Sequence, residues 1–146
     1  MKTRFDYVFE TENRYPGAPA VQEIEIDGSP FTLGDTQVIP IEVDHNGLPV
    51  FGFRIQDFVY ITDAKTVPDS ELEKLKDVKA LVVNALRHER HQSHFNLEEA
   101  LAFIAKVNPE RAYLTHISHL MGFHEEVQQT LPENVFLAYD QLEIIL

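Results

Sequence analysis

The sequence predicts one α/β domain over residues 1–146, with a β-rich first third and alternating strands and helices after it. In the first third, apolar and polar residues alternate, which is typical of strands with one face in water. After Asp63, helix-start signals alternate with short, fully apolar runs. Several strand-like runs end at a histidine or an acid, where a buried strand usually gives way to a plain turn.

The first part of the chain is expected to form short antiparallel strands. Apolar residues recur at every second position in 5–9, across 21–43 and again in 51–55. Asn46 and Gly47 are a typical hairpin turn between two of these runs. The result would be an antiparallel meander, followed by an apolar strand at 58–61 that is covered on both faces.

The second part of the chain predicts strands that alternate with helices. Pro68 followed by acidic residues marks one helix start, and Asn96 with Glu99 resembles a capping box that opens another. Asn108 and Pro109 end that second helix. The other expected elements are strands at 80–83, 113–114, 135–139 and 142–146 and a helix at 125–131.

Composition narrows the class of protein. A hydrophobic content of 44% excludes wholesale disorder, and the lack of cysteine excludes disulfides and thiolate metal sites. The formal net charge of −12 predicts a surface that repels nucleic acid and anionic membrane. The apolar runs are too short to span a membrane and no cleavable leader opens the chain, so a cytoplasmic protein is expected.

Three candidate metal ligands stand at strand ends. His45 follows the strand-like run that ends at Asp44, Asp63 follows the run at 58–61, and His116 follows the short strand at 113–114. In an α/β sheet, side chains at the carboxyl ends of neighbouring strands converge on one crevice. Imidazole and carboxylate groups are the ligands that divalent transition metals prefer, so these residues predict part of a hydrolytic metal site.

Each candidate also has a plain structural interpretation. His116 can be a strand-end histidine bonded to backbone, and Asp63 an ordinary turn or helix cap. His45 fits a hairpin position beside Asn46 as well as it fits a metal site, and His94 can simply pack the start of the helix after Asn96. The other two histidines of the 87–95 loop, His88 and His91, are expected to be solvated.

An ordered series of short motifs points to a family. In chain order, the motifs are Val43-Asp44-His45, Gly52-Phe53-Arg54-Ile55, Tyr60-Ile61-Thr62-Asp63, Ser93-His94-Phe95-Asn96-Leu97-Glu98-Glu99-Ala100, Leu114-Thr115-His116-Ile117-Ser118-His119 and Ala138-Tyr139-Asp140. Over roughly the last two thirds of the chain, this series resembles the metallo-β-lactamase superfamily. Within it, the series is most similar to small phosphodiesterase-type hydrolases related to the phosphodiesterase of the carbon–phosphorus lyase pathway.

The resemblance implies an αββα sandwich that binds two metal ions, zinc or manganese, at one edge and acts on a small phosphorylated substrate. By position in the motifs, His45 matches a ligand of one metal and His116 a ligand of the other. Asp63 matches the aspartate that bridges both metals. His94 matches a histidine that binds no metal but approaches the substrate phosphate and protonates the leaving group.

The chain departs from the family in its first part. The signature His-x-His-x-Asp-His cluster should precede His45, yet residues 1–44 contain no histidine. The resemblance therefore implies the carboxyl-terminal part of the sandwich, with the distal half of a dinuclear site, partial or absent metal binding and little activity alone. The alternative is a non-catalytic half-domain for assembly, a homo-oligomer formed through an exposed sheet face or edge.

Overall fold

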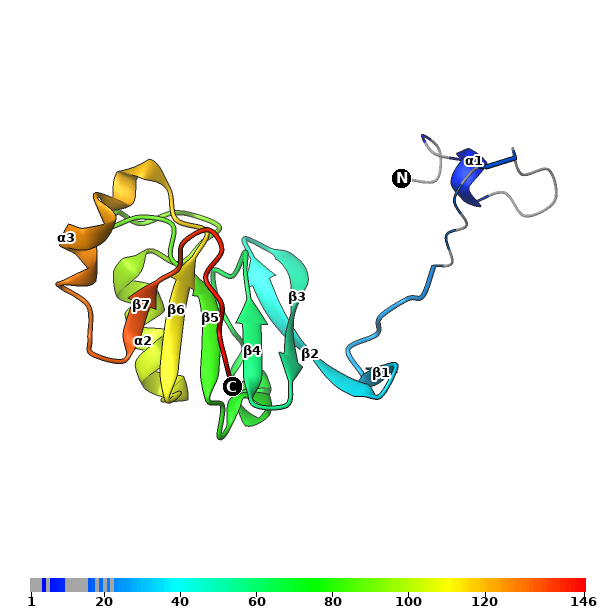
Figure 1. Cartoon of the computed structure of the whole chain (residues 1–146), viewed down its shortest axis with the longest axis horizontal. Coiled ribbons are helices and arrows are strands. Elements are labelled where there is room, and N and C mark those ends of the chain that lie inside the picture. Colours follow the sequence, from blue (N-terminus) through cyan, green and yellow to red (C-terminus); the bar gives the residue numbers. More distant parts are fainter. Residues whose placement is uncertain (1–3, 5, 10–15, 18, 20, 22) are drawn as a thin grey trace.

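Figure 1 shows a computed structural model of the chain, in which residues 4, 6–9, 16, 17, 19, 21 and 23–146 are described. Their centre is a seven-stranded sheet in which strand order follows chain order. The strands are β1 (Phe31–Leu33), β2 (Thr36–His45), β3 (Leu48–Ile55), β4 (Phe58–Ile61), β5 (Ala80–Asn84), β6 (Arg111–Thr115) and β7 (Val135–Leu137). The α/β class with a β-rich first part is confirmed.

The helical segments of the described residues are short. They are α1 (Asp6–Phe9), η1 (Asp69–Leu75), α2 (Leu97–Val107), η2 (His119–Met121) and α3 (His124–Gln128), where η denotes a 3-10 helix. None of the described helices has the length and apolar character that crossing a bilayer requires.

The type of strand pairing changes once across the sheet. β1 to β4 pair antiparallel, as the predicted meander requires, whereas β4 to β7 pair parallel. The parallel connections from β4 to β5 and from β5 to β6 contain η1 and α2. Because two antiparallel steps restore direction, β2 runs the same way as β4, β5 and β6, and these four strands end at one edge of the sheet.

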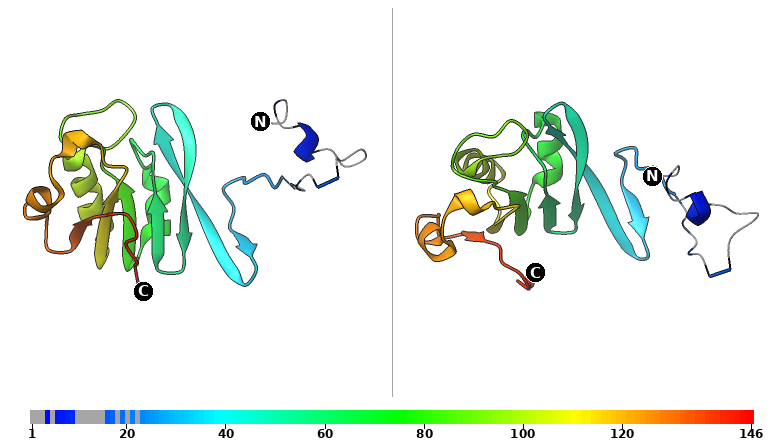
Figure 2. Two further views of the ribbon diagram at one scale, coloured as in Figure 1. Left: turned by 45° about the horizontal axis from the view of Figure 1, so that its top comes forward. Right: turned by 90° about the horizontal axis from the view of Figure 1, so that it is seen from above.

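The main core lies between the sheet and its helices. In the view from above, α2 and η1 lie on one side of the sheet and the chain's C-terminus on the other (Figure 2, right). Ile61, Leu81 and Leu114 point to the helical side and are fully buried, and Ala100 and Ile104 of α2 are buried with them. All five residues of β5 are buried, which explains why its sequence is apolar without alternation.

The second face of the sheet is covered by the end of the chain itself. Val82 and Tyr113 are buried there, and Leu142 and Ile144 pack against them. Figure 1 shows this C-terminal segment in red, crossing the front of the sheet. The sheet face on which self-association was expected is therefore partly covered within one chain.

Three strand predictions are wrong. Residues 6–9 form α1 instead of a strand, and Phe5 lies outside the described residues. Residues 23–27 belong to no strand, and Ile24 is 76% exposed. The segment 142–146 crosses the sheet face and adds no strand to the sheet edge. In addition, the helix expected at 125–131 is shorter and ends at Gln128.

The predicted capping box at the start of α2 is confirmed. The Glu99 amide donates to the Asn96 side chain at 2.9 Å, and the Asn96 amide donates to the Glu99 carboxylate at 3.0 Å. The helix ends at Val107 and is capped by Asn108, whose left-handed backbone (φ 54°) stops the helix just before Pro109.

A buried asparagine fixes the chain that follows β4. Asn84, the last residue of β5, is fully buried. Its side-chain oxygen accepts from the Ala64 amide at 2.9 Å, and its side-chain nitrogen donates to the Ala64 carbonyl at 3.0 Å. The Ala64 carbonyl also accepts from the Phe95 amide at 2.8 Å. Asn84 thus joins the ends of β4 and β5 to the start of α2.

Replacing Asn84 with Ala should lower the free energy of unfolding by about 2–4 kcal/mol, because the Ala64 amide loses its side-chain partner, the Ala64 carbonyl loses one of its two donors and a fully buried side chain is truncated. Urea denaturation with a two-state fit measures the change. Gln129→Ala, which removes an exposed side-chain amide, is the control and should change stability by less than about 0.5 kcal/mol. An Asn84→Ala chain as stable as the control would contradict the assignment.

Candidate metal centre

The four predicted site residues lie at the edge where the same-direction strands end. His45 is the last residue of β2, and Asp63 stands two residues beyond β4. His94 lies in the loop that connects β5 to α2, and His116 follows β6 directly. The sheet therefore brings together side chains from distant parts of the sequence, as the convergence of strand ends predicts.

Asp63 is the centre of this group. Its Oδ1 lies 3.0 Å from His94 Nε2 and 3.5 Å from His116 Nδ1. The His94 ring also lies between two other imidazoles, with ring centroids 4.6 Å from His45 and 4.6 Å from His116. His45, Asp63 and His94 each offer one ligand atom, and these three atoms lie within 4.8 Å of one another. We refer to His45, Asp63, His94 and His116 as the edge cluster.

Two members of the edge cluster have a left-handed backbone. Asp63 and His116 both have φ of 57°, at the points where the chain leaves β4 and β6. This conformation costs a non-glycine residue roughly 1–2 kcal/mol and turns the chain sharply. The bidentate clamp of Asn84 on Ala64 holds the turn at Asp63.

The turn after Asp63 is also bonded to the end of β2. The Lys65 amide donates to the Asp44 carbonyl at 2.7 Å, and the Asp44 amide donates to the Thr66 carbonyl at 2.9 Å. The Lys65 ammonium pairs with the Glu99 carboxylate at 2.8 Å, which ties the same turn to the first turn of α2. The backbone next to His45 and Asp63 is therefore held by contacts with the end of β2, the end of β5 and the first turn of α2.

His94 is more enclosed than His116, with 12% of its side chain exposed against 37%. Burial lowers the pKa of His94 below its ordinary value. The hydrogen bond to Asp63 acts in the opposite direction, while the nearby imidazoles of His116 and His45 lower the pKa further. The result favours a neutral imidazole near neutral pH in the absence of other charges.

The donor set fits a divalent transition metal. Among the described residues, His45 Nδ1 is buried and has no hydrogen-bond partner. An unpaired buried imidazole nitrogen is costly, and a metal ion would satisfy it. The three possible ligand atoms that lie close together belong to His45, Asp63 and His94, and none of them belongs to His116. The resemblance instead gives the ligand role to His116 and the substrate role to His94.

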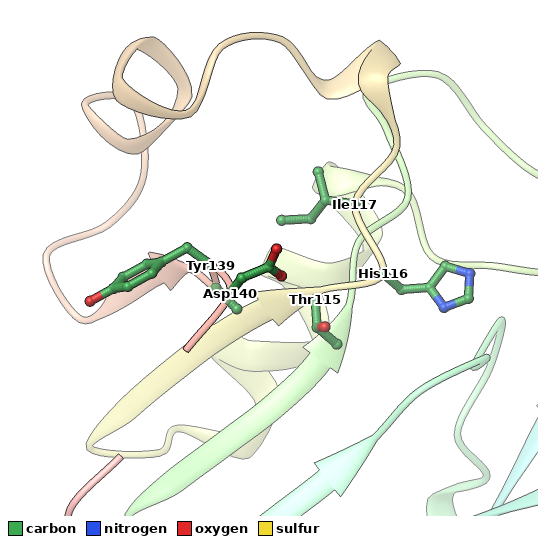
Figure 3. A pocket seen from close by; sticks show the side chains of 6 residues that line it. Thr115, His116, Ile117, Tyr139 and Asp140 are labelled. Atoms are coloured by element: carbon green, nitrogen blue, oxygen red, sulfur yellow. The ribbon is translucent and has the colours of Figure 1, made fainter. Parts of the chain in front are cut away.

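Figure 3 shows a cavity beside the edge cluster, of about 250 Å³. It is lined by Thr115, His116, Ile117, Ala138, Tyr139 and Asp140. The His116 ring points away from Asp140 in this view. His116 Nδ1 instead lies 3.3 Å from the hydroxyl of Thr62. Asp140 therefore lines the approach to the site but does not orient His116.

Sequence reasoning missed several residues that shape the site. Asn84 left a signal, because it is the polar end of an otherwise apolar strand. No signal in the sequence pointed to Ser93. His91 was expected to be solvated, but its ring packs on His94 with ring centroids 5.1 Å apart. His88 has a structural contact, its Nε2 lying 2.9 Å from the Met121 carbonyl.

Comparisons with known proteins match this fold. The model of the beta-lactamase superfamily domain matches residues 1–117. A diphosphatase from the PhnP family superposes over 97% of this chain and 51% of its own, with a TM-score of 0.85 and 30% identity. The metallo-β-lactamase fold protein YhfI from Bacillus subtilis covers 93% of this chain, with 58% of its own chain covered, a TM-score of 0.67 and 17% identity.

An octanoyltransferase of Porphyromonas gingivalis is 34% identical over 148 residues, which cover 100% of this chain and 30% of that protein. The chain thus spans about half of the diphosphatase and less than a third of the octanoyltransferase. The family model and the superposed structures agree on the same fold family. The chain therefore belongs to the metallo-β-lactamase superfamily.

Proposed function

We propose that this chain supplies the distal half of a two-metal site that hydrolyses phosphoesters in a small phosphorylated substrate. His45, Asp63 and His116 would bind metal, and His94 would protonate the leaving group. The observation that carries the proposal is the edge cluster itself, in which His94 and His116 both approach Asp63 Oδ1, at 3.0 and 3.5 Å. The 30% identity to a diphosphatase supports phosphorus chemistry.

The residues have distinct tasks in this proposal. When bound, zinc or manganese ions would supply positive charge for the phosphoryl oxygens and lower the pKa of water. Asp63 holds the His94 and His116 rings on one oxygen, which sets the spacing of the nitrogens around it. When protonated on both nitrogens, His94 would give the Nε2 proton, which faces Asp63, to a departing alkoxide and return to the neutral ring.

Part of the site would come from polypeptide outside this sequence. The 146 residues contain no His-x-His-x-Asp-His motif, and about half of the diphosphatase is not covered. The name octanoyltransferase belongs to a protein of which the chain matches 30%. Imidazoles around a carboxylate favour metal-dependent hydrolysis at this edge.

A second candidate is assembly through the second face of the sheet. The sequence alternative of a non-catalytic module gains support from apolar side chains that stay exposed beside the C-terminal segment. Tyr60 is 42% exposed, Ile145 81% and Leu146 57%. A homodimer could bury these residues, whereas the edge cluster would then have no chemical role.

Replacing Asp63 with Asn should weaken zinc or manganese binding by at least about tenfold, because the shared carboxylate oxygens lose their charge. Isothermal titration with each metal measures the affinity. Asp35→Asn is the matched control, since it removes the same charge from an exposed turn between β1 and β2. Equal affinities for Asp63→Asn and Asp35→Asn would show that the ion binds elsewhere on the acidic surface.

With saturating metal, this chain alone should hydrolyse bis(p-nitrophenyl) phosphate little faster than the metal ions in buffer do. The reason is that three ligands without their partners neither fix two ions nor activate water. Release of p-nitrophenolate, followed by absorbance, measures the rate. Robust turnover that Asp63→Asn abolishes would overturn the claim that the site is incomplete.

A further inference from the structure

The His94 ring has partners on both of its nitrogens. Nε2 lies 3.0 Å from Asp63 Oδ1, inside the edge cluster. Nδ1, on the other side of the ring, lies 3.0 Å from the Ser93 hydroxyl and 3.1 Å from His91 Nδ1. The Ser93 hydroxyl also lies 3.2 Å from His91 Nδ1, so three polar atoms form a closed triangle.

We infer that His91 and Ser93 are positioning residues, which hold the His94 ring in the one orientation and tautomer that place a proton on Nε2. The importance of this arrangement for catalysis rests on the proposed function. The arrangement itself is a property of the chain and can be tested without any reaction.

The proton count supports the inference. A carboxylate can only accept a hydrogen bond, so in a neutral ring His94 Nε2 carries the proton and Nδ1 presents a lone pair. Two imidazole nitrogens 3.1 Å apart repel each other unless a proton lies between them or a third group donates to them. The Ser93 hydroxyl is such a donor, and His91 becomes one when its proton is on Nδ1.

His91 can take either tautomer in this triangle. The Ser93 amide lies 3.4 Å from His91 Nδ1, the longest contact of the set, and it fits a His91 ring that accepts. In that case the Ser93 hydroxyl alone donates to His94. In both arrangements His94 Nδ1 is an acceptor, so both lead to the same state of His94.

The surrounding loop keeps the triangle in place. It has no regular secondary structure, but both of its ends are bonded to neighbouring chain. The Leu86 amide donates to the Phe95 carbonyl at 2.9 Å, and the Asn96 side chain donates to the His88 carbonyl at 2.9 Å. These bonds close the loop, so residues 91, 93 and 94 can meet although no helix or strand sets their spacing.

The consequence is that the nitrogen of His94 on the Asp63 side carries a defined proton. With Nδ1 held as an acceptor, the nitrogen that faces Asp63 is the protonated one. The opposite tautomer would present a lone pair there, which cannot donate a hydrogen bond to the carboxylate. Partners of the second nitrogen fix the tautomer of functional histidines in the same way in other proteins.

The test is a two-bond ¹H–¹⁵N correlation spectrum of the imidazole rings in the metal-free chain. At a pH of about 8.5, roughly two units above the usual histidine pKa, the rings are neutral and the tautomers are distinct. We expect His94 as the Nε2–H tautomer, with Nδ1 shifted by the hydrogen bond that it accepts. Ser93→Ala and His91→Leu should each move the Nδ1 resonance toward the position of an unbonded nitrogen.

Matched variants separate positioning from general disturbance. Ser93→Thr keeps the hydroxyl and His91→Asn keeps a polar group near Nδ1, so both should retain the wild-type His94 shift. Gln92→Ala, an exposed change in the same loop, and His119→Asn, an exposed histidine elsewhere, should have no effect on it.

A His94 ring in the Nδ1–H tautomer in the wild-type chain would overturn the inference. So would an Nδ1 resonance that stays in place in both Ser93→Ala and His91→Leu. The expected spectra together with absent metal binding would leave the positioning intact and count against the proposed hydrolase. Metal binding together with spectra that lack the expected His94 shifts would count against the positioning alone.

Discussion

The register of the parallel strands is the constraint on which the site depends. Ile61 pairs with Val83, and Val83 pairs with Leu114, so these residues of β4, β5 and β6 lie at one level across the sheet. Asp63 and His116 then leave the sheet from that level with the same left-handed backbone. A slip of one residue would move either side chain by about 3.3 Å and turn it to the other face.

Hydrogen bonds turn this common edge into a defined cluster. The Asn84 side chain holds Ala64, the backbone of Asp44 holds Lys65 and Thr66, and Lys65 pairs with Glu99. These contacts leave Asp63 Oδ1 facing two imidazoles, one of them largely buried. A rigid shell of this kind lets a ligand set keep its geometry before an ion arrives, which lowers the cost of binding.

Local sequence signals predicted the parts of the fold that depend on local physics. The capping box at Asn96 and the apolar strand β5 need no distant partner to be recognised. A period of two at 23–27 and at 142–146 says which side chains share a face, but a strand also needs a neighbour that supplies hydrogen bonds. In both segments that neighbour is missing from the sheet of the described residues.

In the candidate site, too, local signals predicted some residues, whereas residues that act through distant partners were missed. His45, Asp63 and His116 could be selected because they stand beside strand ends and match family motifs, whereas His94 was selected from its motif alone. The structure brings the four together. Asn84 and Ala64 are separated by 20 residues, and no local pattern links them. Ser93 and His91 matter through a triangle of side chains in an irregular loop, which only coordinates could show.

The most direct measurement of the central claim is paramagnetic broadening by manganese(II). We predict that manganese broadens the imidazole signals of His45, His94 and His116 at lower concentrations than those of His119 and His124. Broadening that spares any of the three cluster histidines, or that affects all histidines alike, would contradict a common metal site at this edge of the sheet.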